Sequence, residues 1–194
     1  LTVSNLILFI ALLQGFSLDT ITFINTSLKL NGGMKILEDF FAPEGFVAPL
    51  IYYYLGIFIK NKIVSHFIVS ILFNSVYFIL IFKIIDSKFK NTKISLIFAF
   101  ISSCFFLSLM GGMYFDHFII ILFLIGILTA HLKKSYIIKI IILSIIFNLM
   151  FFSKISLALP SIILILIYNF FYINNKKFEF IFYLSVCSIL FLSI

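Results

Sequence analysis

Long apolar runs separated by short polar segments make up most of this 194-residue chain. Seven of these runs can be read along it, at 1–16, 63–82, 94–115, 117–132, 136–152, 155–173 and 178–194. A helix needs about 17–25 apolar residues to cross a bilayer, and the strands of a membrane β-barrel would alternate instead. The pattern therefore predicts an all-α fold, a polytopic bundle of about seven transmembrane helices.

The composition leads to the same class of protein. Hydrophobic residues make up 63% of the chain and charged residues 11%, with a mean hydropathy of +1.27. Soluble domains are about half apolar and about a quarter charged. A soluble core could not absorb this much apolar surface, so we expect one transmembrane domain over residues 1–194.

The charged residues decide how the apolar but short run 46–59 is placed. If this run does not cross the membrane, the most basic loops share one side, and their residues are Lys83, Lys88, Lys90, Lys93, Lys133, Lys134, Lys176 and Lys177. The loop 17–62 on the other side has four lysines and four acids, which cancel. Cytoplasmic loops carry such a basic excess. If 46–59 crossed, the loop 83–93 would lie outside and every later loop would change sides.

We therefore expect 46–59 to be an interfacial or re-entrant helix on the outer face. Pro49 suits its first turn, and the tyrosines at 52–54 suit the membrane interface. This topology also collects residues that are far apart in the sequence. Those expected at the outer face are Asp19, Glu38, Asp39, Asp116, His117 and Lys154.

The net charge of +7 does not indicate nucleic-acid binding. All fourteen basic residues are lysines, and arginine, the usual reader of bases and phosphates, is absent. Cys104 and Cys187 lie within apolar runs and are expected to be packed thiols. The excess of Ile, Phe, Lys and Asn is typical of an AT-rich genome and indicates a bacterial inner membrane protein.

Both ends of the sequence suggest a fragment. It begins at Leu1 rather than methionine, and Ile194 falls within an apolar run. The first run lacks a basic segment before it and a small-residue cleavage site after it, so we do not expect a cleaved signal peptide.

Three local motifs stand out. Asp19 follows the first run and is itself followed by NGG, EDFFAPEG and the helix EGFVAPLIYYYLGIF. GGMYFDH places Asp116 at the outer end of a helical hairpin, and FFSKISLALP places Lys154 between two spans.

In order and spacing, these motifs resemble the N-terminal part of the GT-C glycosyltransferases, which include protein mannosyltransferases and aminoarabinose transferases. In that family a catalytic acid follows the first span, and an aromatic juxtamembrane helix comes after a proline-rich turn. The resemblance covers most of the chain and implies an inverting transferase that uses a polyprenyl-phosphate-sugar donor. The second acid or arginine usual after the first acid is missing here, since Thr20 and Ile21 follow Asp19.

The chemistry of this reaction fits the residue types. Transfer from a lipid phosphate to a hydroxyl needs a base and a positive charge for the departing phosphate. Asp19 is the predicted catalytic base, and a lysine can bind phosphate as a point charge. Carboxylate oxygens could hold the acceptor, the sugar or a divalent cation. The predicted substrate-binding residues are Glu38, Asp39, Asp116, His117 and Lys154.

Each residue also has a structural alternative. Asp19 could mark the interface, Asp116 could cap a helix, and Lys154 could extend to the headgroups. His117 could be an interfacial residue, and His131 is expected at the inner face, outside the site. Among functions, a transporter or lipid flippase is the alternative, although it predicts charges at mid-span rather than at span ends. A non-catalytic membrane assembly subunit is a third reading.

Overall fold

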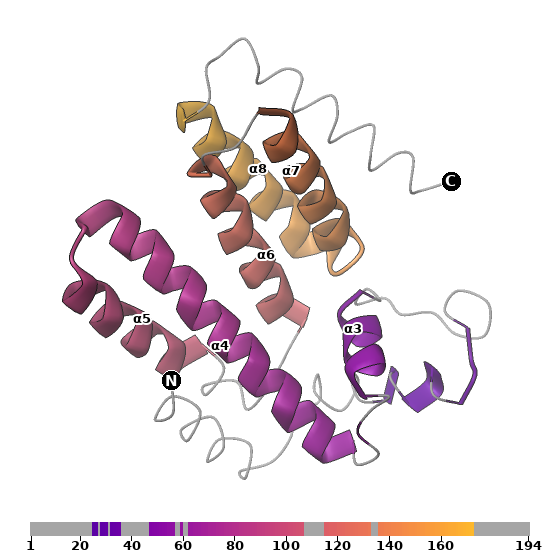
Figure 1. The fold of residues 1–194 in the computed structure, drawn as a ribbon. Coiled ribbons are helices and arrows are strands. Elements are labelled where there is room, and N and C mark those ends of the chain that lie inside the picture. The colour runs from indigo at the N-terminus through magenta and orange to yellow at the C-terminus, as the bar shows by residue number, and fades with distance from the viewer. Residues whose placement is uncertain are drawn as a thin grey trace. The chain divides into compact units, whose positions relative to one another are not determined.

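The computed structural model describes residues 25–26, 28–30, 32–35, 47–56, 59, 62–106, 115–132 and 136–172. The regular elements within these ranges are helices, which confirms the all-α class (Figure 1). They are α3 (Val47–Gly56), α4 (Lys62–Phe89), α5 (Thr92–Phe106), α6 (Phe115–Ala130), α7 (Tyr136–Phe151) and α8 (Ile155–Tyr172). The chain divides into two compact units, Leu1–Phe118 and Ile119–Ile194, and the single domain expected from the sequence would comprise both.

Five of the predicted spans correspond to helices α4–α8, and the run 46–59 corresponds to α3. The helix predicted over 94–115 is described as far as Phe106. The runs 1–16 and 178–194 lie outside the described residues.

One helix among the described residues is by itself long and apolar enough to cross a membrane. This is the 23-residue stretch Phe67–Phe89 of α4. The other apolar helices are shorter and comprise Thr92–Phe106, Asp116–Ala130, Ile137–Phe151 and Ile155–Asn169. Length and composition therefore support one crossing here, fewer than the five predicted for this part of the chain.

The turn between α4 and α5 is built from residues that end one helix and begin the next. Lys90 follows α4 with a φ of 50°, the left-handed conformation common at helix ends, and its N–H donates to the Asp86 carbonyl at 2.9 Å. Asn91 caps α5, since its Oδ1 accepts the N–H of Ile94 at 3.2 Å. Ser95 Oγ donates to Asp86 Oδ1 at 3.4 Å. The two helices therefore form a tight antiparallel hairpin (Figure 1).

Small residues line the face of α5 that is buried in this hairpin. Ser95, Ala99 and Ser103 recur every four residues and are fully or almost fully buried. Small side chains at this spacing let two helix backbones approach closely. The hydroxyl of Tyr77 on α4 and Oγ of Ser102 on α5 are 2.6 Å apart and share a hydrogen bond. This contact ties the helices together away from the turn.

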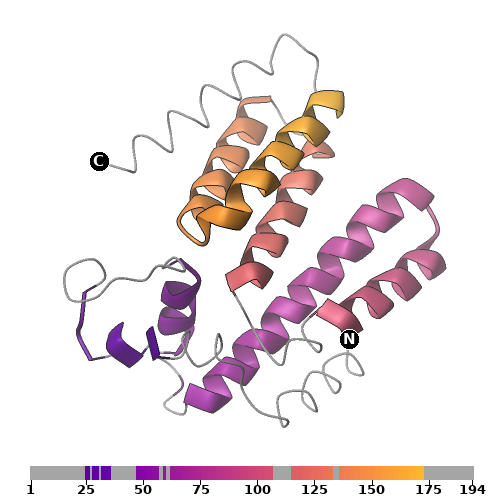
Figure 2. The same ribbon diagram turned by 180° about the vertical axis from the view of Figure 1, so that it is seen from behind.

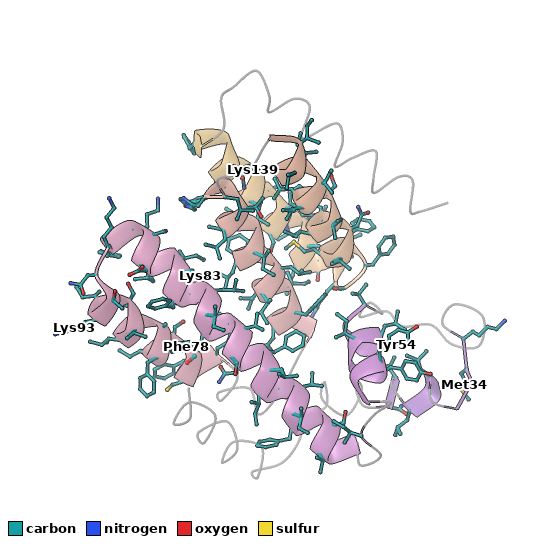
Figure 3. All side chains as sticks on the ribbon, viewed as in Figure 1. Met34, Tyr54, Phe78, Lys83, Lys93 and Lys139 are labelled. Carbon is teal, nitrogen blue, oxygen red and sulfur yellow. The ribbon has the colours of Figure 1, made fainter. Side chains whose placement is uncertain are left out.

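Replacing Lys90 by glycine is expected to stabilise the protein by about 1 kcal/mol, because a left-handed conformation costs a non-glycine residue roughly 1–2 kcal/mol. Thermal unfolding of the detergent-solubilised protein measures the change. Lys93→Gly, at a helical position near the same turn (Figure 3), is the matched control, and glycine there is expected to destabilise. Equal shifts of the two variants in the same direction would contradict the assignment of strain to Lys90.

The NGG motif noted in the sequence ends a short helical turn at 28–30. The N–H of Gly33 donates to the Leu30 carbonyl at 3.0 Å, and the N–H of Met34 donates to the Lys29 carbonyl at 3.1 Å. This pair of bonds is a Schellman motif, whose left-handed residue is Gly33 with a φ of 83°. The position needs glycine because a side chain rarely tolerates this conformation.

The second unit contains the rest of α6 with α7 and α8 (Figure 2). At Gly126, α6 lies against the side chain of Ile165 on α8. A Cβ atom added there would lie 2.6 Å from Cδ1 of Ile165. Nδ2 of the buried Asn169 donates to the Ile165 carbonyl at 2.9 Å and to the Gly126 carbonyl at 3.4 Å. The absence of a side chain at Gly126 and the interhelical hydrogen bond of Asn169 therefore both stabilise the contact between α6 and α8.

The helix α3 is short and contacts α4. The rings of Tyr53 and Tyr54 lie edge to face on it, with centroids 5.2 Å apart, and Tyr54 is exposed (Figure 3). Exposed tyrosines are typical of membrane interfaces. The helix predicted at 46–59 is confirmed, while its placement on the outer face stays a prediction.

Candidate functional site

Three of the six predicted site residues can be located in the structure. Asp116 and His117 lie in the first turn of α6, and Lys154 lies between α7 and α8. Asp19, Glu38 and Asp39 lie outside the described residues.

Asp116 is half-buried and is the acidic residue of the first turn of α6. A carboxylate is stabilised at this end of a helix, because the unpaired backbone N–H groups carry positive partial charge. This placement agrees with the helix-capping alternative. The role of Asp116 in substrate binding stays a prediction.

His117 differs sharply from its neighbour in exposure. Its side chain is only 1% exposed, and Nε2 lies 3.0 Å from the backbone oxygen of Phe106. A carbonyl oxygen can only accept, so Nε2 carries a proton and donates. Phe106 is the last described residue of α5. The imidazole thus forms a hydrogen bond to α5 from the start of α6.

An aromatic cluster surrounds this hydrogen bond. The ring of His117 stands edge to face on Phe106, with centroids 4.7 Å apart and planes at 89°. Phe106 in turn stacks on Tyr77 of α4, with centroids 3.7 Å apart and planes at 4°. We call Tyr77, Phe106 and His117 the aromatic seam. Phe118 adds a second contact with α4, since its ring lies 6.0 Å from that of Phe73.

The sequence reasoning missed Tyr77 and Phe106 altogether. The chain has 28 phenylalanines and nine tyrosines, so neither residue stood out as more than apolar bulk. The available signal was a histidine beside an acid at the start of an apolar helix. A polar ring buried there must find a hydrogen-bond partner, but its partner cannot be read from the local sequence.

Lys154 joins the last turn of α7 to the first turn of α8. Its N–H donates to the Met150 carbonyl at 3.2 Å, and its carbonyl accepts the N–H groups of Leu157 at 3.2 Å and Ala158 at 2.9 Å. The side chain is half-buried. Carbonyls at the end of α7 and N–H groups at the start of α8 therefore lie in the same turn. The carbonyls attract an ammonium group, and the N–H groups attract an anion.

A second polar cluster lies at the other end of α6 and within the second unit. Nε2 of His131 and the hydroxyl of Tyr168 share a hydrogen bond of 2.7 Å, and Lys139 Nζ donates to the Ala130 carbonyl at 2.9 Å. His131 directly follows α6, whose residues from Asp116 to Ala130 span about 21 Å at 1.5 Å per residue. The expectation that His131 lies outside the site stays a prediction.

Among the described residues, no three His, Cys, Asp or Glu side chains gather as a potential metal site, and the divalent cation stays a prediction. No family model matches this chain, and no curated protein or solved structure matches it. The interpretation of the site therefore depends on its own residues.

Proposed function

We propose that this chain is the membrane-embedded part of a glycosyltransferase that moves a sugar from a polyprenyl-phosphate donor to a lipid, glycan or protein acceptor. We place it in a bacterial inner membrane with its site at the outer face. The distribution of side chains on the helices is the observation that carries the membrane placement. Water-soluble helices bury their apolar face and expose their polar one, whereas α4 and α5 bury mainly small or polar residues and expose large apolar side chains.

The reversal is plainest on α5. Its buried residues are Ser95, Ala99 and Ser103. After Lys93 in its first turn, its large exposed side chains are apolar, and they comprise Ile94, Leu96, Ile97, Phe98, Phe100, Ile101 and Phe105. Exposing this surface to water would oppose folding, because each buried Leu, Ile or Phe side chain is worth about 1.5–3 kcal/mol. Lipid tails solvate it without such a cost.

The helix α4 repeats the pattern at one-turn spacing. The apolar residues exposed along one face are Val64, Ile68, Leu72, Val76 and Ile79. Three polar residues of the helix are fully buried, and they are Ser65, Ser70 and Asn74. Buried polar groups between apolar outer faces are typical of helices that associate in a membrane.

The exposed apolar side chains of α8 support more than one crossing. They include Leu159, Ile163, Ile167 and Phe171. A helix of 15–18 residues is about 22–27 Å long at 1.5 Å per residue, and a bilayer can thin to fit such a helix at a modest cost. This supports the proposal that the shorter helices also cross, as part of the seven spans expected from the sequence.

The transfer step follows from the residue types at the proposed outer face. Asp19 would accept the proton of the acceptor hydroxyl as it attacks the sugar carbon that bears the phosphate. The bond from that carbon to the phosphate oxygen breaks, and the lipid phosphate leaves with its negative charge. Lys154 would bind this phosphate. Asp116, with Glu38 and Asp39, would hold the acceptor or the sugar, either directly or through a divalent cation.

Replacing Lys154 by glutamine is expected to raise the KM for the donor roughly 10- to 100-fold, because a hydrogen bond to a charged group is worth about 1.5–3 kcal/mol. The assay uses membranes washed with alkaline carbonate, a panel of polyprenyl-phosphate sugars and detection of the released lipid phosphate. An integral protein remains in the washed membranes. The exposed Lys93, changed to glutamine, is the matched control and should leave the KM unchanged.

Two results would contradict the proposal. The membrane placement is wrong if carbonate removes the protein from the membranes. The transfer function is wrong if the retained protein acts on no donor in the panel, and uptake or flipping of a lipid by the same membranes would then favour the transporter alternative.

A loss of stability in Lys154→Gln with an unchanged donor KM would assign Lys154 to the carbonyls at the end of α7 instead.

A further inference from the structure

A hydrogen bond of the His117 side chain joins the start of α6 to α5. Ten residues separate Phe106 from His117 in the sequence, yet Nε2 of His117 donates to the Phe106 carbonyl at 3.0 Å. This hydrogen bond therefore holds the first turn of α6, which contains Asp116, beside Phe106 of α5.

The contact between α5 and α6 also involves a third helix, α4. Phe106 stacks on Tyr77, and Tyr77 shares a hydrogen bond with Ser102 at 2.6 Å. The pair Phe118–Phe73 makes a second contact between α6 and α4. Each ring of the aromatic seam thus has neighbours on a different helix, which restricts both the position and the rotation of the first turn of α6.

The rotation of α6 decides where the carboxylate of Asp116 lies. Consecutive residues of a helix are about 100° apart around its axis, since a turn has 3.6 residues. With His117 on the buried side, Asp116 is placed at the edge of that side, and it is half-buried. If the seam were lost, the first turn could rotate or fray, and the carboxylate would move with it.

We propose that His117 is a positioning residue that holds Asp116 in place for substrate binding, through its hydrogen bond to Phe106 and its contact in the aromatic seam. This rests on the proposed function, in which Asp116 holds the acceptor or the sugar. His117 then acts through its neighbour and does not itself touch the substrate.

Two substitutions separate the hydrogen bond from the packing. His117→Phe keeps a ring against Phe106 but removes the donor. His117→Gln places an amide N–H near the position of Nε2 and can donate to the same carbonyl. His131→Phe is the matched control, because His131 is a hydrogen-bonded histidine at the other end of α6.

Sugar transfer by the full chain in proteoliposomes tests the proposal. We expect His117→Phe to raise the acceptor KM about 10-fold or more, since misplacing a group by 1 Å can cost on the order of 100-fold. His117→Gln should restore the KM and His131→Phe should leave it unchanged. In an Asp116→Asn background His117→Phe should have no further effect, because residues that act as one unit are not additive. Additive effects would overturn the proposal.

A measurement without activity keeps the two proposals separable. Asp116→Cys, in a background with Cys104→Ser and Cys187→Ser, is labelled in membranes with an impermeant maleimide. We expect His117→Phe to change the labelling rate several-fold and His117→Gln to leave it unchanged. An unchanged rate in His117→Phe would overturn the positioning role, even if no donor is used. If the wild-type protein is inactive but His117→Phe still changes the labelling rate, only the glycosyltransferase function would be overturned.

His117→Asn covers the case in which the phenylalanine variant does not insert. Its shorter amide cannot occupy the position of Nε2, so it should behave like His117→Phe in both measurements. Labelling and KM equal to those of the wild type would contradict the role of the hydrogen bond.

Discussion

Replacing Asp19 by asparagine is expected to lower the rate of sugar transfer about 10²- to 10⁴-fold, the range typical of a lost general base. Asparagine has nearly the same shape as aspartate but cannot accept the proton of an attacking hydroxyl. The substrate should still bind, so the loss falls mainly on kcat. A residue that only marked the membrane interface would tolerate the exchange without loss of rate.

The measurement compares carbonate-washed membranes that contain equal amounts of each variant. Glu44→Gln is the matched control, because Glu44 is an acid of the same predicted outer loop that belongs to no proposed step. We expect Glu44→Gln to retain the activity of the wild type. Full activity of Asp19→Asn would remove Asp19 from the catalytic role, and equal losses in both variants would indicate a general effect of charge in the loop.

Replacing Gly126 by valine is expected to have the largest effect on stability and to lower the free energy of unfolding by about 3 kcal/mol or more. Overpacking a close contact costs typically about 1–3 kcal/mol and occasionally more. Even the Cβ atom would lie 2.6 Å from Cδ1 and 3.0 Å from Cγ1 of Ile165, and valine adds two methyl groups. Separation of α6 from α8 would also weaken the hydrogen bond of Asn169 to the Gly126 carbonyl at 3.4 Å.

A double-mutant cycle identifies the cause. Gly126→Ala and Ile165→Ala should each destabilise the protein, the first by crowding and the second by leaving a cavity. Together they should cost less than the sum, because Ile165→Ala removes the side-chain atoms that the new Cβ meets. Unfolding in mixed detergent micelles measures all three. Strict additivity would show that Gly126 and Ile165 are not in contact.

Local patterns were enough to locate the helices. The apolar runs predicted helices close to the bounds of α6, α7 and α8, because a helix satisfies its backbone hydrogen bonds within the segment. The end predicted for α4 was wrong, since the helix continues to Phe89 through residues assigned to the loop 83–93. The short run 46–59 was correctly read as a separate helix. Among the described residues, only Phe67–Phe89 has the length of a crossing, fewer than the five crossings predicted for this part of the chain.

The candidate site was predicted only in part. Asp116 and Lys154 lie at helix ends, as the positions of their motifs in the sequence indicated. The surroundings of His117 could not be predicted in the same way. Its hydrogen bond to Phe106 and the stacking of Phe106 on Tyr77 join three helices, and residues of these types occur in many other places along the chain.

The sequence by itself determined that this chain is helical and mostly apolar, and where α6, α7 and α8 lie along it. These properties follow from composition and from hydrogen bonds between near neighbours, so a local pattern contains them. Only the tertiary structure decided that serines and alanine line the interior of the α4–α5 hairpin, that Gly126 meets Ile165, and that His117 ties α6 to α5. These contacts depend on how helices rotate and approach one another, which is set by the fit of side chains far apart in the sequence.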